Sequence, residues 1–580
     1  MIAPSPATSA PCVLLAFNAN NQLAVRRSGT NLGHAFVAAD ETTAAARLET
    51  GFRVHTPPAE YFTASTDGTL LRVFFVQVDG APADGEVEFR TLEQLEADRG
   101  ALSPALAAVL DGLGPHLIEI PYLHLGESDY IYKFRVERDR NRDIYQQDDH
   151  ARALYQSRLC EAIKTLARTN ERSASGPARL DFGAVSYLIP SHFGFCLGVK
   201  NAIERAYETL AENPGKRVFM LSELIHNSFV NEDLLRRGLR FLQTDKGQPF
   251  TTGGEIAPTG SSLGPLLWDT LTSDDIVIIP AFGATDEDKK KLVRKGIRVA
   301  QFDATCMLVE KVWKAARSFG RDGYTVIIHG KSEHEETKAT FSNSRRYAPS
   351  IIIRNVDEAR QLGDYIAVPS EEKRQAILSR FAGLHTPGFD PAVHLDRIAV
   401  VNQTTLLMNE TATIIDYFKA LFVTKYGEAS GPSHVGGAGK KDTLCYATQV
   451  NQDALQRALA EPLDAAFIIG GKNSSNTYQL YRLCEQKLGL RAFFIQSEAN
   501  IRSRDEIEHY VFSAGGGGKC GHTEIHALWP GDDSPKRVLI TGGASCPDGL
   551  VQQVMTRINS FFPPQGLRSV EDVLSSLTAG

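Results

Sequence analysis

The strongest constraint on the fold is a pattern that recurs between about residues 181 and 565. Short apolar runs end in small polar residues, and each is followed by a stretch with helical spacing. Runs rich in Val and Ile and bounded by Gly, Ser or Thr are typical of buried parallel strands, and their alternation with helices predicts an α/β fold. The runs are RVFMLSELIHN, DIVIIPAFGA, RVAQFDATC, YTVIIHGK, IAVVNQTT, DAAFIIGGKNSSN and RVLITGGASCPD.

The rest of the chain has a different character, and 580 residues are too many for one typical domain. Residues 1–115 carry the apolar runs CVLLAF, QLAV and LRVFFVQV and a helical stretch at TLEQLEADRG, which predict an α+β domain. Residues 116–180 are charged and predict solvated helix that ends in a Ser/Gly/Pro linker. Residues 566–580 are assigned to a tail.

Composition narrows the function. The net charge of −7 argues against a nucleic-acid partner, and no apolar run approaches the roughly 20 residues of a membrane span. The first residues show no secretory signal. Eight cysteines scattered along the chain do not form a disulfide framework and indicate a reducing, cytoplasmic setting.

Polar side chains follow the predicted strands, at the edge where ligands of open α/β sheets bind. Ser, Thr and Asn at such places are ordinary helix caps, but free N–H groups at helix starts also favour an anion such as phosphate. The sequence does not decide between helix capping and anion binding for these residues. They are His226, Asn227, Phe282, Gly283, Thr305, Cys306, His334, Glu335, Glu336, Gln403, Thr404, Thr405, Ser474, Ser475, Asn476 and Ser545.

Three cysteines share one context, the start of a helix. Cys196 opens a helical stretch in FGFCLGVKNAIERAYE, and Cys306 and Cys445 precede two others. A helix dipole favours the thiolate form at this place. The three could converge if three α/β units face one another, which their spacing alone does not show.

Eight motifs in this order resemble the family of 4-hydroxy-3-methylbut-2-enyl diphosphate reductase, in its plant and cyanobacterial branch. The resemblance covers about residues 181–560, and the charged stretch before it is similar to that branch's N-terminal extension. The motifs are FGFCLGVKNAIERAYE, LSELIHN, DATCMLVEKV, HGKSEHEETKAT, VNQTTL, CYAT, GGKNSSN and GGASCPDGLVQ.

The resemblance implies a trefoil of three similar α/β units, roughly 181–303, 304–442 and 443–565, around one [4Fe–4S] cluster. Cys196, Cys306 and Cys445 match the ligand positions, which leaves one iron without a protein ligand. Such an open iron can act as a Lewis acid towards the substrate hydroxyl. The implied reaction removes that hydroxyl as water with two electrons and protons and yields isopentenyl and dimethylallyl diphosphate.

Other roles carry over by position. Glu336 matches a proton-relay glutamate, and Thr404 matches a threonine that hydrogen-bonds the substrate hydroxyl. Six residues match the diphosphate-binding set, in agreement with the anion pocket inferred from the strand ends. They are His226, His334, Ser474, Ser475, Asn476 and Ser545.

Two departures from the family pattern stand out. Phe282 replaces a histidine of many bacterial members, which we interpret as a difference between lineages, and Met307 stands where proline usually follows the second ligand cysteine. Cys520 and His522 lie in the glycine-rich stretch GGGGKCGH, which we interpret as a loop rather than a metal site.

Residues 11–114 resemble a Nudix domain in outline, with an opening hairpin at CVLLAFNANNQLAVRRSG and the end of the metal-binding helix at RLETGFRV. The acidic residues expected to bind Mg²⁺ fall on Ala44, Ala45 and Leu48, and only Glu49 remains. The sequence therefore predicts a degenerate Nudix-like domain without hydrolase activity. An unrelated α+β domain is the alternative.

Three functions remain to be distinguished: the reductase, an iron–sulfur electron carrier or binding protein, and a bifunctional fusion with an active Nudix or isomerase domain. Glu336 and Thr404 favour the reductase, because a carrier has no need of a proton relay. The resemblance implies a ferredoxin or flavodoxin as electron donor.

Overall fold

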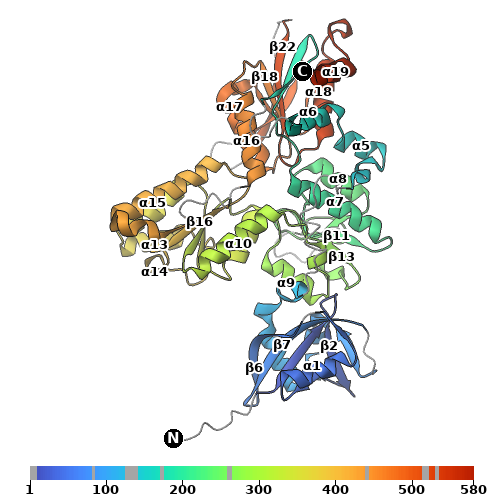
Figure 1. Cartoon of the computed structure of the whole chain (residues 1–580), viewed down its shortest axis with the longest axis vertical. Coiled ribbons are helices and arrows are strands. Elements are labelled where there is room, and N and C mark those ends of the chain that lie inside the picture. The colour runs from blue at the N-terminus through green and yellow to red at the C-terminus, as the bar shows by residue number, and fades with distance from the viewer. Residues whose placement is uncertain are drawn as a thin grey trace.

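The computed structural model describes residues 10–55, 57–80, 85–123, 141–169, 176–257, 264–437, 443, 445–512, 521–528 and 534–579. It shows an N-terminal domain at one end of an elongated molecule, followed by three α/β units (Figure 1). Residues 124–140 and 170–175, which include most of the predicted linker, lie outside the described residues, as does Cys520.

The N-terminal domain is built on one mixed sheet in which β1 runs parallel to β7. Side chains of β1 alternate between two apolar cores: Leu14 packs with helix α1 on one face, and Val13 and Leu15 pack with α2 and α3 on the other. This alternation follows the period of two of a strand covered on both sides. The elements are β1 (Cys12–Phe17), β2 (Leu23–Ser28), β3 (Asn31–His34), β4 (Phe36–Ala38), α1 (Glu41–Glu49), β5 (Arg53–Val54), β6 (Ala59–Thr66), β7 (Thr69–Asp79), β8 (Val87–Arg90), α2 (Leu92–Ala97) and α3 (Pro104–Leu113).

Three further sheets carry the predicted α/β pattern. The first has the order β12-β11-β13, the second β15-β14-β16-β17 and the third β19-β18-β22-β10-β9, and all pairs are parallel except β9 with β10. The strands are β9 (Ala178–Asp181), β10 (Val185–Ile189), β11 (Val218–Met220), β12 (Arg240–Phe241), β13 (Ile276–Ile278), β14 (Thr325–His329), β15 (Ser350–Ile353), β16 (Ile398–Asn402), β17 (Val435–Gly436), β18 (Ala465–Ile469), β19 (Ala492–Ile495) and β22 (Lys536–Gly542). The α/β class predicted from the sequence is confirmed.

Helices connect these strands, as expected of parallel sheets. They are α5 (Asp149–Tyr155), α6 (Arg158–Thr169), α7 (Leu197–Glu212), α8 (Ser228–Arg236), α9 (Asp286–Arg294), α10 (Met307–Arg321), α11 (Glu335–Ser344), α12 (Val356–Ala367), α13 (Glu371–Arg380), α14 (Pro391–His394), α15 (Met408–Ser430), α16 (Tyr446–Ala458), α17 (Ser475–Leu488), α18 (Asp548–Asn559) and α19 (Val570–Ala579). A two-stranded hairpin, β20 (Ile507–Phe512) with β21 (Gly521–His526), follows β19.

The first sheet is the centre of the packing. Along β11, Val218 and Met220 enter a core shared with the third sheet, whereas Phe219 enters the core of the N-terminal domain. One sheet thus joins the N-terminal domain on one face to the third unit on the other. The second sheet has its own core, which includes Ile327 and Phe418.

Three sequence predictions need revision. The run RVAQFDATC contains a short 3-10 turn at Ala300–Phe302 in place of a strand. Strand β10, within the first predicted unit of 181–303, pairs with β22 and so belongs to the sheet of the third unit. The predicted tail forms helix α19, whose Val573 lies in the same core as the first and third sheets.

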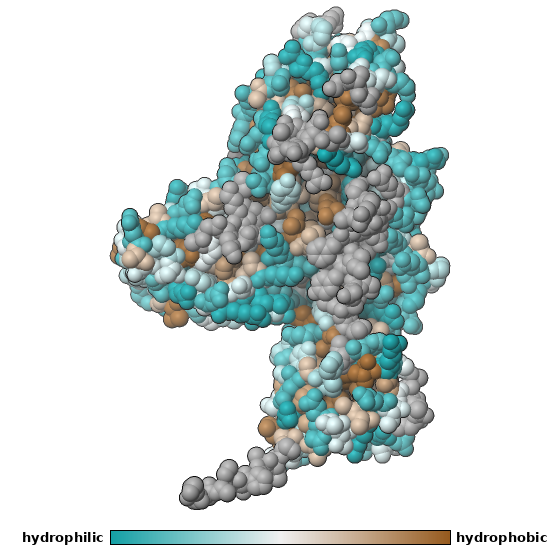
Figure 2. Space-filling view, in the orientation of Figure 1, coloured by the Kyte–Doolittle hydropathy of each residue, from teal (hydrophilic) through white to brown (hydrophobic). Residues whose placement is uncertain are grey.

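No helix in the described part of the chain combines the length and the apolar character that crossing a membrane requires. The face of the molecule in Figure 2 is mainly hydrophilic, with hydrophobic residues in scattered patches.

Candidate active site

The three cysteines at helix starts occupy equivalent places in the structure. Cys196, Cys306 and Cys445 are the N-cap residues of α7, α10 and α16, each with extended backbone angles, and none of the three thiols accepts a capping hydrogen bond. An N-cap side chain that does not cap can point elsewhere. The helix starts therefore position these thiols, although the thiols do not stabilise the helices by capping them.

The three thiols also lie close to one another. The electrostatic environment of Cys306 includes Cys196 and Cys445, and that of Cys445 includes Cys196. Gly198, in the first turn of α7, faces the Cys306 side chain, and a Cβ at this position would overlap the Cys306 sulfur. The glycine therefore leaves space that any other residue would fill.

Burial dominates the protonation of these groups. It raises the pKa of Cys196 and Cys306 and raises the pKa of Cys445 to about 11. Backbone N–H groups, such as that of Val199 beside Cys196, lower the pKa in the direction expected of a helix start. The helix starts thus favour the thiolate form as the sequence suggested, but desolvation outweighs this effect in the free thiols.

The other described cysteines have a different setting. Cys12, Cys160, Cys484 and Cys546 are fully buried, whereas the three at helix starts are partly accessible. Burial raises the pKa of Cys160 to about 12. These four behave as small core residues.

Glu336, in the first turn of α11, carries a fully buried carboxyl group. The backbone N–H of Thr404 donates to its Oε1 at 2.5 Å, while Oε2 has no hydrogen-bond partner. Burial raises its pKa to about 7, and the Glu336 charge acts on Cys445. A carboxyl group in this state can hold or release a proton near neutral pH.

An aromatic side chain contacts two of the histidines that the sequence assigned to the site. The ring of Phe282 stacks on His226 with centroids 4.3 Å apart, and His334 meets His226 edge-on at 5.1 Å. His334 also caps α11, because its Nδ1 accepts from the backbone N–H of Glu336 at 3.2 Å. Phe282 therefore occupies the site as a packing partner of both histidines.

The polar residues of the third unit divide into two kinds. Ser474 caps α17 by accepting from Thr477 N–H at 3.3 Å, and Ser545 donates to the backbone carbonyl of His226 at 3.1 Å. Ser475 Oγ and Asn476 Nδ2 are buried without a hydrogen-bond partner. Buried polar atoms are normally paired, so these two are available to a ligand.

Glu335 is a residue to which the sequence assigned no role. Its buried carboxylate lies 3.8 Å from His226 Nε2, and burial raises its pKa to about 7. Its position beside Glu336 at a strand end could have indicated a role in the site. Adjacent helix residues normally point in different directions, however, so the sequence alone did not favour two site carboxylates in a row. Met307 is the first residue of α10, a position where proline and methionine both fit, so the helix starts there without the proline.

Three partly accessible thiols lie at helix starts, one of them near a buried acid, and two buried polar atoms of the third unit have no hydrogen-bond partner. Together these groups define a metal-cluster enzyme of the α/β class. The thiol set fits an iron–sulfur cluster, since thiolate is the ligand that such clusters take.

Comparison with known proteins agrees with this class. The model of the family "LytB protein" matches residues 188–559. A 4-hydroxy-3-methylbut-2-enyl diphosphate reductase of Acaryochloris marina is 35% identical over 391 residues, 66% of this chain and 86% of the relative. The enzyme of that name from Gloeobacter violaceus is 35% identical over 410 residues, 71% of this chain and 88% of its own. The chain belongs to the LytB protein family.

Two solved structures are also similar. One is an (E)-4-hydroxy-3-methyl-but-2-enyl diphosphate reductase, 24% identical over 64% of this chain and 98% of its own, with a TM-score of 0.36. The other is the corresponding reductase from Plasmodium falciparum, 18% identical over 68% of this chain and 98% of its own, with a TM-score of 0.43.

Proposed function

We propose that the chain is a 4-hydroxy-3-methylbut-2-enyl diphosphate reductase, which removes the allylic hydroxyl of its substrate and forms isopentenyl and dimethylallyl diphosphate in the last step of the non-mevalonate isoprenoid pathway. The observation that carries the proposal is the buried Glu336 carboxyl, with one unpaired oxygen, near the Cys445 thiol of the helix-start set. An electron carrier or a simple binding protein has no use for such a group. The name that its relatives share supports the same reaction.

The cofactor is a [4Fe–4S] cluster, for which Cys196, Cys306 and Cys445 would be the ligands. Once bound, it supplies electrons and an iron that lacks a protein ligand and acts as a Lewis acid. Gly198 contributes by leaving space next to Cys306. Burial raises the pKa of the free thiols, so an unoccupied site disfavours the thiolate form. A cluster that binds thiolate strongly would offset this effect.

Glu336 would protonate the hydroxyl that leaves as water. Its pKa of about 7 keeps a large fraction protonated at neutral pH, and the Thr404 N–H holds Oε1 so that Oε2 faces its surroundings without a partner. We assign Thr404 to the substrate hydroxyl, because its backbone already fixes it against Glu336.

The diphosphate would bind to the polar atoms of the first, second and third units. Ser475 and Asn476 offer unpaired buried groups, and the N-terminus of α17 adds N–H donors and the positive end of a helix dipole. His226, His334, Ser474 and Ser545 complete the assigned set. Two of these residues also have structural roles. Ser545 donates a hydrogen bond to the His226 backbone, and Ser474 caps α17.

Electrons would come from a ferredoxin or flavodoxin. An open pocket reaches Cys196 and is bordered by Lys164, Arg168 and Lys200. A basic border suits an acidic electron carrier, and contact at this place would bring the carrier close to a cluster ligand. The free thiols that the cluster requires fit a reducing, cytoplasmic compartment.

We assign residues 1–115 to a degenerate Nudix-like domain. Where a metal-binding helix would carry carboxylates, Ala44 and Leu48 of α1 are fully buried in an apolar core, so the helix turns a packing face to the sheet. The domain would dock on the first unit without hydrolysing a diphosphate.

The test is an anaerobic preparation of the full chain supplied with the hydroxylated diphosphate and a reduced dye. We expect a brown protein with [4Fe–4S] absorbance that consumes the substrate and releases both isoprenoid diphosphates. A protein that stays colourless after reconstitution would exclude the proposal, and a coloured protein without turnover would favour the electron carrier.

A further inference from the structure

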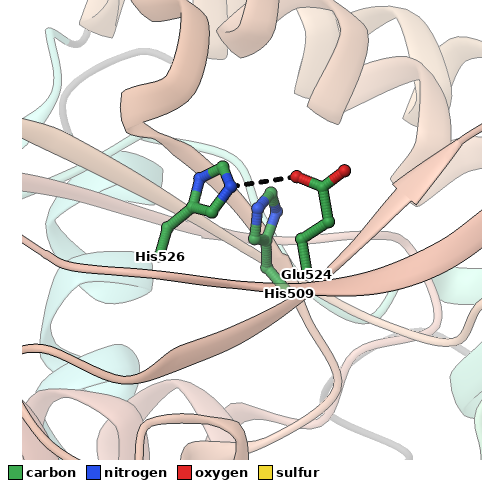
Figure 3. A group of neighbouring side chains, drawn as sticks. All are labelled: His509, Glu524 and His526. Atoms are coloured by element: carbon green, nitrogen blue, oxygen red, sulfur yellow. Dashed lines mark hydrogen bonds and ion pairs between the residues drawn. The ribbon is translucent and has the colours of Figure 1, made fainter.

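The hairpin β20–β21 gathers three metal-binding side chains on one face. His509 and Glu524 are directly opposed across the two antiparallel strands, and His526 follows Glu524 by two residues. Opposed residues of a pair lie on the same face, and so do residues two apart on one strand. Figure 3 shows the two imidazoles and the carboxylate turned toward one another from the two strands.

His509 is the unusual member of this group. Its side chain is only 3% exposed and packs edge-on against Phe493 of β19 with ring centroids 5.4 Å apart. Neither ring nitrogen has a hydrogen-bond partner. Leaving a buried polar group unpaired costs on the order of 1–3 kcal/mol, so a buried imidazole with two unpaired nitrogens calls for a ligand.

The charge state suits metal binding. Burial, reinforced by the neighbouring His526, lowers the pKa of His509 to about 4, so this ring is neutral at pH 7 and keeps a lone pair for a metal. Hydrogen bonds from His522 and His526 lower the pKa of Glu524, which is therefore ionised. Two imidazoles and a carboxylate form one of the common ligand sets of zinc.

The distances are close to those that zinc requires. The nearest ligand atoms of His509, Glu524 and His526 all lie within 4.8 Å of one another, and His526 Nε2 is 2.9 Å from Glu524 Oε2. Bonds of about 2.0–2.2 Å in a tetrahedron place neighbouring ligand atoms about 3.4 Å apart. A rotation of the partly exposed Glu524 and His526 side chains is enough to reach that spacing.

We propose that His509, Glu524 and His526 bind a zinc ion that clips the two strands of this hairpin together. The fourth position would go to water or to His522, which lies on the same face and contacts Glu524 Oε1 at 2.6 Å. None of the residues assigned to the reductase site lies on β20 or β21. The site is therefore structural: it holds the hairpin against β19, next to which Ile507 and His509 are buried.

The test is equilibrium dialysis of the cluster-loaded protein against zinc chloride under anaerobic conditions, followed by metal analysis. We expect about one zinc per chain with unchanged iron content, and zinc binding weaker by at least about tenfold in Glu524→Gln and His526→Gln. Both residues are partly exposed, so these variants keep their fold. Glu508→Gln, which removes a carboxylate from the same hairpin that pairs with Arg502, serves as the matched control and should bind zinc normally.

Two further readouts separate a specific site from weak surface binding. Zinc X-ray absorption should show two imidazole ligands, or three if His522 takes the fourth position, and zinc should raise the Tm of the wild type and of Glu508→Gln but not of His526→Gln. Failure to bind zinc, or equal binding by His526→Gln and the wild type, would overturn the proposal. Turnover with the diphosphate substrate should be unaffected in both variants, so this test is independent of the proposed reaction.

Discussion

Helices α1 and α11 have nearly the same length, 9 and 10 residues, yet they bury opposite kinds of side chain. Helix α1 of the N-terminal domain buries Ala44 and Leu48. Helix α11 of the second unit buries Glu336 together with threonine, serine and asparagine side chains. Burial of polar groups costs free energy unless they are paired, and a fold keeps such a cost mainly where it is used. The contrast supports the proposed site role of α11 and a packing role for α1.

The largest effect expected from this contrast concerns the cluster ligands. Cys306→Ser should abolish both the cluster absorbance and all turnover, because serine is a poor ligand for a cluster that takes thiolates. Iron analysis and visible absorbance of the anaerobic protein measure the outcome. Cys484→Ser, at a fully buried cysteine of the third unit, is the matched control and should keep its iron. Retention of the full iron content by Cys306→Ser would contradict the assignment.

A smaller effect follows from the raised pKa of Glu336. An acid must be protonated to donate, so kcat/KM should be constant below pH 7 and fall about tenfold per pH unit above it. The pH profile of kcat/KM with substrate measures this limb. Glu335 has the same pKa of about 7, so Glu335→Gln must be compared. The limb should persist in that variant, and its loss there would transfer the role of acid to Glu335.

The next prediction concerns the diphosphate site. Asn476→Ala removes the Nδ2 donor that has no partner in the protein, and it also removes the Oδ1 that accepts from Ala544 N–H at 2.8 Å. We expect KM to rise about tenfold, since a hydrogen bond to a charged group contributes about 1.5–3 kcal/mol, with little change in the cluster spectrum. An unchanged KM would place the diphosphate elsewhere.

Helix α1 itself offers a buried position and a partly exposed position next to each other. Ala44→Glu introduces an acidic residue at a fully buried position and should lower the free energy of unfolding by about 3 kcal/mol, because the carboxylate enters an apolar core. Ala45→Glu, at a partly exposed neighbouring position, should cost less than about 1 kcal/mol. Urea unfolding of both variants measures the difference. Equal stability would mean that this face of α1 is open to solvent and could accommodate metal ligands.

The smallest effect concerns the contact between the N-terminal region and the first unit. Tyr122 donates to Asp303 at 2.9 Å and accepts from Lys289 at 3.1 Å, and Asp303 in turn accepts from the N–H of Thr305, the residue before Cys306. Tyr122→Phe should cost about 1 kcal/mol in unfolding free energy. Tyr426→Phe, at a more exposed tyrosine that donates to Asp396, is the control and should cost less. An equal loss in the two variants would show that the Tyr122 contact has no special weight.

Local patterns were enough to predict much of the fold. Apolar runs predicted the buried strands β11, β13, β14, β16, β18 and β22. The positions of three cysteines at helix starts were also predicted from the sequence. The polar residues after those strands were also recognised as candidates for the site. Only the hydrogen bonds of the structure distinguish those that cap a helix from those that could bind a ligand. Ser474 is a cap, whereas Ser475 and Asn476 have unpaired atoms.

What the sequence did not show depends on contacts between distant residues. The pairing of β10 with β22 joins segments about 350 positions apart, and RVAQFDATC has the composition of a strand but pairs only through the single bridge Ile279 with Asp303. The cluster of His509, Glu524 and His526 was missed because it arises from strand register across a hairpin. The roles of the site residues remain predictions from the family resemblance, supported by their geometry.

The most direct test of the central claim compares Glu336→Gln with Glu333→Gln in the anaerobic turnover assay. Glu333 lies three residues earlier, is partly exposed and pairs with Arg354, and its variant should turn over like the wild type. Glu336→Gln should keep the iron content and absorbance of the cluster but lose about 10²- to 10⁴-fold in turnover, the usual contribution of a positioned acid. Undiminished turnover by Glu336→Gln with its cluster intact would contradict the account.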